Sequence, residues 1–398
     1  MRLSFASMAI VLGLLSAVGP FAIDMYLPAL PTISADLHAA TSATQMTLTA
    51  FFVTFGVCQL VYGPVSDMLG RKRPLYFGLV VFLLGSLGCA VAPNVDTLIL
   101  LRVVQGIGAA SVAVIPRAII RDLHTGTQAT RLMSLVMLVF SVSPILAPLT
   151  GSGLIVVSGW RAIFVVLAVV TLLSLFLTAV VLPETRAEQD RVPVSFGEVV
   201  RSFASLFRHR RFMGLTFIGG LGISSFFAFL ASSSFVYISH FHLTPMQYGL
   251  AFSVNAVGFI GASQFAASLG ERFGMTRVVG VAVSLYAAFA VLLFATTVAG
   301  VDSLVVVMSL LFPSFAFLGL VVPATMVLSL DDQGPIAGMA ASLGGTLQML
   351  TGGVVMVIVS VFFDGTAAPM VSAIAACAVG AAILSFFVLS QPRLVAAE

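Results

Sequence analysis

Apolar stretches of roughly 18 to 25 residues recur along nearly the whole chain, separated by short polar segments. An α-helix of that length crosses the roughly 30 Å hydrocarbon layer of a bilayer with its backbone hydrogen bonds satisfied internally. We therefore predict an all-α membrane protein with twelve transmembrane helices, over residues 5–30, 44–66, 74–93, 97–117, 131–155, 160–183, 212–238, 246–270, 276–298, 302–329, 335–363 and 367–390. The first stretch also allows a cleaved signal peptide as an alternative, but Asp24 and three prolines interrupt it.

One long polar stretch, from Glu184 to Arg211, separates six predicted spans from six and carries six arginines. We predict an N-terminal six-helix half over residues 1–183, a cytoplasmic linker over 184–211 and a C-terminal six-helix half over 212–398. Apolar residues in the linker recur at helical spacing between positions 195 and 207. This segment is therefore either a helix on the membrane surface or a solvated loop.

The two predicted halves repeat one another. The segment after the second span reads GPVSDMLGRKRPL, and the segment after the eighth reads AASLGERFGMTRVV. A shift of 204 residues superimposes Asp67 on Glu271, Gly70 on Gly274 and Arg73 on Arg277. Degenerate copies of this kind are expected for two pseudo-symmetric six-helix halves that are related by an axis along the membrane normal.

Composition and charge agree with this architecture. Hydrophobic residues make up 60% of the 398 positions and charged residues 8%, and the mean hydropathy of +1.14 excludes a water-soluble domain. Under the predicted spans, fifteen of the eighteen Lys and Arg residues, from Arg2 to Arg393, fall on one side, and only Arg161 falls on the other. Lys and Arg accumulate in cytoplasmic loops, so both termini are expected in the cytoplasm. The net charge of +3 then reflects topology, and no nucleic-acid partner is expected.

Two charged residues lie well inside predicted spans, Asp24 in the first and Arg102 in the fourth. Each lies six residues from the outer end of its span, about 9 Å below the outer surface at 1.5 Å per residue. Matching depth makes pairing feasible, and a buried carboxylate near an arginine is the minimal machinery for binding and releasing a proton. The alternatives are that Asp24 caps a helix broken at Pro28 and that Arg102 extends outward to the interface.

The loop after the second span matches the pattern G-x-x-x-D-x-x-G-R-K/R through Gly63, Asp67, Gly70, Arg71 and Lys72. Asp67 and Arg71 are four residues apart, so a continuing helical turn would pair them, and Gly70 permits a tight bend. With this loop the chain resembles the major facilitator superfamily.

Within that superfamily, the stretch IDMYLPALP over residues 23–31 is similar to the first helix of the Bcr/CflA-type drug:proton antiporters. The resemblance implies that Asp67, Arg71 and Asp122 form a cytoplasmic gating charge cluster. The plain alternative is three solvated loop charges.

Two further motifs of this family lie in the fourth and fifth spans. The fourth contains LLRVVQGIGAA, whose small residues permit close helix contact, and matches the family through Arg102, Gln105, Gly106, Gly108 and Ala109. The fifth contains FSVSPILAPLTGSG, in which two prolines bend a helix that must flex during alternating access. Its antiporter-helix motif comprises Pro144, Pro148 and Gly151.

Substrate contacts are expected from aromatic and amide side chains within spans. Aromatic walls with few polar groups suit apolar molecules of varied shape, and an amide within a span needs a partner or a wet cavity. Most of the 33 phenylalanines must face lipid or neighbouring helices. That packing role is the alternative to substrate contact for the two phenylalanines among the candidates. The candidates are Tyr26, Gln45, Gln105, Phe226, Phe227, Asn255 and Gln348.

The resemblance implies a secondary active transporter of a bacterial cytoplasmic (inner) membrane. Such a protein exports small drug-like or antibiotic molecules in exchange for protons by alternating access. Its expected partners are substrate, protons and lipid, with no cofactor and no metal, and we expect a monomer. A same-fold carrier of an endogenous metabolite, by export or proton symport, is the alternative. A membrane enzyme or receptor is disfavoured, because the sequence has no nucleophile with a base, no ligand-spaced His or Cys cluster and no phosphate-binding loop.

Overall fold

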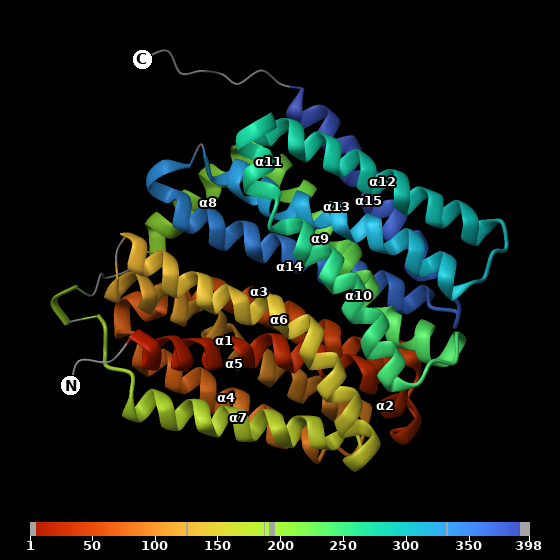
Figure 1. Cartoon of the computed structure of the whole chain (residues 1–398). Coiled ribbons are helices and arrows are strands. Elements are labelled where there is room, and N and C mark those ends of the chain that lie inside the picture. The colour runs from red at the N-terminus through yellow and green to blue at the C-terminus, as the bar shows by residue number, and fades with distance from the viewer. Residues whose placement is uncertain (1–4, 125, 187, 191–195, 332, 391–398) are drawn as a thin grey trace. The chain divides into compact units, whose positions relative to one another are not determined.

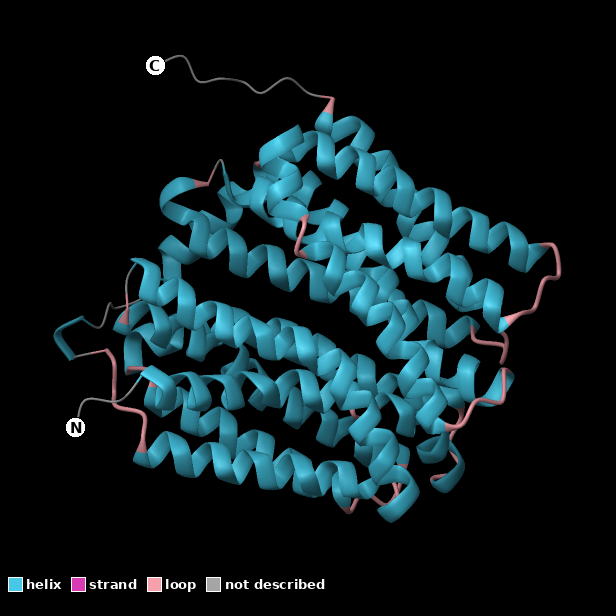
Figure 2. Cartoon of the chain, in the orientation of Figure 1, coloured by secondary structure: helices cyan, strands magenta, loops and turns pink. Residues whose placement is uncertain are grey.

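A computed structural model of the chain describes residues 5–124, 126–186, 188–190, 196–331 and 333–390. Within these ranges every regular element is a helix (Figure 1, Figure 2). Three of the arginines that we assign to the cytoplasmic side, Arg2, Arg191 and Arg393, lie outside the described residues, as does part of the predicted linker.

Twelve helices in the described ranges are long and apolar enough to cross a membrane. They cover residues 7–36, 41–69, 72–90, 95–123, 131–158, 161–180, 210–240, 245–273, 275–298, 304–331, 337–362 and 368–389. This number and the all-α fold class confirm the sequence prediction. The largest differences are in the first and fourth spans, which continue to Asp36 and Leu123. The first is longer because the chain turns after Asp24 and then resumes as helix.

Packing divides the chain into two compact units, residues 1–196 with 234–253 (unit 1) and residues 197–233 with 254–398 (unit 2). The half boundaries at 184 and 211 stay a prediction. The helices that begin before residue 190 are α1 (Phe5–Asp24), η1 (Leu27–Ala29), α2 (Leu30–Asp36), α3 (Thr41–Leu69), α4 (Lys72–Ala90), α5 (Val95–Leu123), α6 (Gly126–Ser158), α7 (Arg161–Val180) and η2 (Glu188–Asp190). The later ones are α8 (Phe196–Arg208), α9 (Arg210–Ser234), the π-helix η3 (Phe235–His240), α10 (Pro245–Ser263), α11 (Ala266–Phe273), α12 (Met275–Val298), α13 (Leu304–Asp331), η4 (Gly334–Ile336), α14 (Ala337–Phe362) and α15 (Ala368–Leu389).

Unit 1 is built around α5, which packs against both α3 and α4, while α1 packs along α6. Small residues on α5 make these contacts possible. A methyl group at Gly108 would clash with the backbone nitrogen of Phe82, and one at Gly106 would lie 2.7 Å from the carbonyl oxygen of Phe51. The backbones therefore approach closely at the family motif of the fourth span, as the sequence predicts.

The segment 234–253 belongs to unit 1 through contacts with α6 and α2. The hydroxyl of Ser152 donates a hydrogen bond to the carbonyl of Pro245 at 2.8 Å, and the hydroxyl of Ser253 donates to the carbonyl of Ile145 at 3.1 Å. The boundaries between the two units thus fall within three helices, after Phe196 in α8, after Ser233 in α9 and after Ser253 in α10.

In unit 2, α12 packs against α13 and α15. The linker segment that the sequence leaves as either helix or loop is helix α8. Leu206 of α8 is buried in a cluster with Phe212 of α9 and with Ala340 and Leu343 of α14. The solvated-loop alternative is therefore wrong, because burial of this apolar face stabilises a helix.

Candidate functional site

The first membrane helix is broken at its predicted charged residue. Helix α1 ends at Asp24, and after a turn the chain continues as η1 and α2, with Pro28 and Pro31 in their first turns. Proline suits these positions because the first turn of a helix leaves its N–H groups unbonded in any case. The Asp24 side chain makes no capping bond to η1 or α2, so the capping alternative is not realised.

Asp24 faces α6, the helix that carries the antiporter motif. Asp24 is 7% exposed, and its Oδ2 atom accepts a hydrogen bond from the hydroxyl of Ser143 at 3.4 Å. Further along α6, a methyl group at Gly151 would clash with the carbonyl oxygen of Met25, the residue after Asp24. Gly151 therefore lets the broken end of α1 lie directly against the proline-containing α6.

Arg102 is completely buried within unit 1, and its guanidinium lies between two aromatic rings. The Cζ atom is 4.5 Å from the ring centroid of Tyr26 and 4.3 Å from that of Phe51, which are cation–π distances. Its Nη1 atom donates hydrogen bonds to the carbonyl of Ala22 at 3.3 Å and to the side-chain oxygen of Gln105. An arginine held on three sides in this way does not extend to the interface, so that alternative is wrong.

Asp24 and Arg102 are not joined by an ion pair in the described part of the chain, although their depths match. Arg102 instead bonds the carbonyl of Ala22, two residues before Asp24, and so contacts the same end of α1. Its Nε and Nη2 atoms have no hydrogen-bond partner among the described residues. Buried donors are normally satisfied, so these two groups are an exception in an otherwise closely packed guanidinium.

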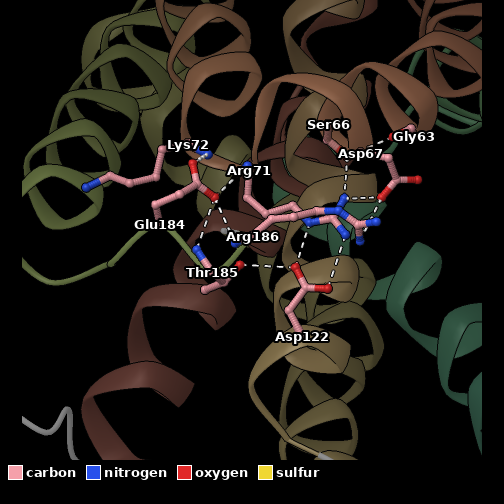
Figure 3. Close-up of polar contacts among 9 residues, drawn as sticks. All are labelled: Gly63, Ser66, Asp67, Arg71, Lys72, Asp122, Glu184, Thr185 and Arg186. Atoms are coloured by element: carbon pink, nitrogen blue, oxygen red, sulfur yellow. Dashed lines mark hydrogen bonds and ion pairs between the residues drawn. The ribbon is translucent and has the colours of Figure 1, made fainter. Parts of the chain in front are cut away.

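A second group of charges gathers around Arg71, which follows the turn between α3 and α4 (Figure 3). Its Nη1 atom lies 2.8 Å from Asp67 Oδ1, and its Nε atom lies 2.7 Å from Asp122 Oδ2. The Arg71 side chain is 3% exposed, and it also donates to the hydroxyl of Ser66 at 2.8 Å. The three residues that the resemblance groups are therefore in contact, and the solvated-charge alternative is wrong for Arg71.

The turn that carries Arg71 needs a glycine. Gly70 has a φ of +86°, in the region that favours glycine, and it ends α3 so that α4 can begin at Lys72. Gly274 has a φ of +84° at the end of α11, in the position that the sequence repeat assigns to it. At the start of the motif, the Gly63 carbonyl accepts a hydrogen bond from Ser66 at 2.8 Å.

Three linker residues, Glu184, Thr185 and Arg186, complete this cluster (Figure 3). The Thr185 hydroxyl donates to Asp122 Oδ2 at 3.1 Å, and Arg186 Nη1 lies 3.4 Å from Asp67 Oδ1. Sequence reasoning missed them, because they stand at the start of a polar stretch more than a hundred residues from Arg71. We use the name Arg71 cluster for Ser66, Asp67, Arg71, Asp122, Glu184, Thr185 and Arg186.

Arg71 and Glu184 are charged at neutral pH. Burial would lower the pKa of Arg71, but Asp122 and Asp67 outweigh burial and raise that pKa. Burial would raise the pKa of Glu184, but the backbone N–H groups of Arg71, Arg186, Lys72 and Thr185 outweigh burial and lower that pKa below its ordinary value. The bonds of the Glu184 carboxylate are therefore complete at neutral pH, and they are lost only as the pH falls through this lowered pKa.

Residues 12–356 match the family model of the Major Facilitator Superfamily. The chain belongs to this superfamily. It is 35% identical over 97% of its length to an uncharacterized MFS-type transporter, YdgK, of Bacillus subtilis, of which it covers 96%. It is 30% identical to a bicyclomycin resistance protein homolog of Haemophilus influenzae, with 96% of each chain covered, and 31% identical to multidrug resistance protein D of Escherichia coli, with 87% of each covered. The resemblance to the Bcr/CflA-type drug transporters is thereby confirmed.

A solved structure of this superfamily shows the same fold. The crystal structure of a D-xylose-proton symporter has a TM-score of 0.74 to this chain, with 18% identity and 97% of each chain covered. At that identity the likeness concerns the architecture alone.

The candidate substrate residues of this superfamily member fall into two groups. Tyr26 and Gln105 surround Arg102, and Gln45 is buried on α3 in the same unit. In unit 2, Phe226 stacks on Phe259 with a centroid distance of 5.6 Å. The other members of that unit are Phe227, which packs against Gly352 of α14, the buried Asn255, and Gln348, which lies beside Gly219 of α9. Their role as substrate contacts stays a prediction.

Gly151→Ala is expected to impair both transport and stability, because the added methyl would meet backbone atoms of Met25, which cannot rotate away as a side chain would. Overpacking of this kind typically destabilises by about 1 to 3 kcal/mol. Gly153→Ala is the matched control, since a methyl there meets nothing within 4 Å. The melting temperature of both purified variants and their drug export in membrane vesicles test this. Equal behaviour of the two variants would show that the Gly151 contact does not position the end of α1.

Proposed function

We propose that this transporter exports small drug-like molecules, antibiotics among them, in exchange for protons by alternating access. The observation that carries the proposal is the buried carboxylate of Asp24 at the break of the first membrane helix. Charged groups inside membrane helices are rare and mark ion or substrate pathways, and a carboxylate binds and releases one proton. The names of the bicyclomycin- and multidrug-resistance relatives support drugs as the substrate class.

The contacts of Asp24 support a coupled mechanism. Its hydrogen bond comes from Ser143 of α6, and the next residue, Met25, packs against Gly151 of the same helix. Pro144 and Pro148 interrupt the hydrogen bonding of α6 between these two contacts, so this helix bends more readily than a regular one. Bending of α6 would change the surroundings of Asp24, and a carboxylate whose surroundings change with conformation can take a proton in one state and release it in the other.

Inverted membrane vesicles with a preformed, inside-acidic pH gradient test this function. Addition of bicyclomycin to vesicles that contain the transporter is expected to collapse part of the gradient, as protons leave in exchange for drug. Asp96→Asn, at an exposed carboxylate in the first turn of α5, is the matched control and should behave as the unmodified protein does. Uptake of drug with no change in the gradient would overturn proton antiport, and a response only to an endogenous metabolite would favour the alternative carrier.

The same proposal includes topology and energy source. The basic residues of the predicted loops support an inner-membrane protein with both termini and the linker in the cytoplasm. The proton gradient is the proposed energy source, without cofactor or metal, and a monomer suffices for it, since both Asp24 and the Arg71 cluster are formed by one chain. Transport of substrate across the membrane, instead of its chemical conversion, is the proposed activity.

Reporter fusions test the topology. A reporter fused after Gln189, in the linker, is expected to be active only as a cytoplasmic enzyme, and one fused after Gly300, between α12 and α13, only as a periplasmic enzyme. The physical reason is that arginines are retained on the cytoplasmic side during insertion. Periplasmic activity from the fusion after Gln189 would overturn the orientation.

A further inference from the structure

The start of helix α4 is held by the carboxylate of Glu184, which comes more than a hundred residues later in the chain. The first backbone N–H groups of a helix have no partner within it, and in α4 Arg71 is the N-cap residue and Lys72 the first helical residue. The side chain of Arg71 gives no capping bond. Instead, Glu184 Oε1 accepts from the Arg71 nitrogen at 2.8 Å, and Glu184 Oε2 accepts from the Lys72 nitrogen at 3.1 Å. A negative charge at a helix N-terminus is also favoured by the helix dipole.

The same carboxylate folds the beginning of the linker around itself. Glu184 Oε1 also accepts from the backbone nitrogens of Thr185 at 3.0 Å and Arg186 at 3.1 Å. These bonds place the Thr185 hydroxyl on Asp122 and the Arg186 guanidinium beside Asp67 (Figure 3). Each carboxylate that binds Arg71 thus also binds one linker side chain.

Arg71 is consequently fixed at two ends. Its guanidinium is held by Asp67 and Asp122, and its backbone nitrogen is held by Glu184. A long side chain can reach two carboxylates at once only if its own backbone is correctly placed. The bonds to Glu184 supply that placement, because Gly70, just before Arg71, is a flexible turn residue with a positive φ.

We propose that Glu184 is a positioning residue of the cytoplasmic gate, which fixes the start of α4 so that Arg71 bridges Asp67 and Asp122 and which makes the first linker residues part of that gate. The inference rests on the gating role in the proposed alternating-access function. Opening of the cluster must then release Glu184, Thr185 and Arg186 as well, so the linker reports the state of the gate.

Full-length variants that carry one spin label at Gln128→Cys and one at Ser268→Cys test this, in a background without native cysteines. Both label positions are exposed, and one lies in each unit. The ratio of the two interlabel distance populations measures the conformational equilibrium. Asp67→Asn is the reference variant for the gate, and Glu188→Gln, in the same linker, is the matched control that loses the same charge.

Glu184→Gln is expected to shift the ratio in the same direction as Asp67→Asn and by at least about fivefold, the lower end of ordinary coupling factors. Because both act through Arg71, the double variant should shift the ratio no further than the larger single one. The substrate affinity of these variants should equal that of the unmodified protein. Glu188→Gln should leave the ratio of the two distance populations unchanged. Thr185→Val removes one hydroxyl only, so it should fold and give a smaller shift in the same direction.

The possible failures are distinguishable. If Asp67→Asn shifts the ratio but Glu184→Gln and Thr185→Val do not, Glu184 merely caps a helix and the positioning role is overturned, while the gate stands. Fully additive shifts in the double variant would also overturn it, since the two residues would then act independently. If Asp67→Asn leaves the ratio unchanged, the gating function itself is wrong and the positioning role falls with it.

Discussion

Asp24→Asn is expected to reduce drug resistance to the level of cells without the transporter, with the protein still folded and inserted. An amide has nearly the shape of the carboxylate and can still accept a hydrogen bond from Ser143, but it cannot bind and release a proton. Arg102→Ala is expected to have the same effect, because it removes the buried charge that contacts the end of α1 through the Ala22 carbonyl. Resistance at matched expression is the measurement.

The controls separate coupling from folding. Asp96→Asn and Arg121→Ala remove the same charges at exposed positions of α5 and should leave resistance unchanged. Purified Asp24→Asn should still bind drug. Full resistance in either the Asp24 or the Arg102 variant would rule out that residue as part of the coupling site.

Export of a neutral drug is expected to respond strongly to the membrane potential. Asp24 is the carboxylate that we place well inside a span, so one proton enters per cycle and one positive charge moves with it. A potential of 100 mV is worth about 2.3 kcal/mol per charge, which corresponds to roughly a 50-fold change in the drug gradient that can be sustained. A monovalent cation exchanged for one proton moves no net charge, so its export should follow the pH gradient alone. Uptake into inverted vesicles, with each gradient imposed separately, measures both.

Strong dependence of monocation export on the potential would require a second proton per cycle. Two carboxylates near the ends of spans, Asp36 and Asp122, are the candidates for such a role, and both are in ion pairs. Asp36 lies 2.6 Å from Arg161, and Asp122 lies 2.7 Å from Arg71. Asp36→Asn and Asp122→Asn, measured in the same assay, would then show which of them titrates.

The four-residue spacing correctly predicts the Asp67–Arg71 pair, but the backbone between the two residues differs from the expected helical turn. The four-residue separation suggests a continuing helical turn, whereas α3 ends at Leu69 and the pair spans the Gly70 turn. The number of spans and the close packing at Gly106 and Gly108 follow from hydrophobic length and small residues, which are properties of short segments. Such features are readable from sequence because they need no knowledge of helix rotation.

Contacts between distant segments could not be predicted in the same way. Equal depth of Asp24 and Arg102 in the membrane is necessary for pairing, but rotation of each helix about its axis decides whether the side chains meet. In the structure, Arg102 turns to Tyr26 and Phe51, and Asp24 turns to Ser143. Glu184 gave no signal, since a glutamate at the start of a polar linker has the same appearance whether it is solvated or caps a helix.

The attachment of Glu184, Thr185 and Arg186 to the end of unit 1 also defines how the protein can be recombined. A chimaera that joins the first six spans of this transporter to the last six of a relative would separate Glu184 from α4 if the junction were placed at Pro183, the end of the hydrophobic segment. A junction after Gln189 keeps all three residues with the helices that they bind. An exchange of the predicted N-terminal half among relatives should therefore include the first residues of the linker.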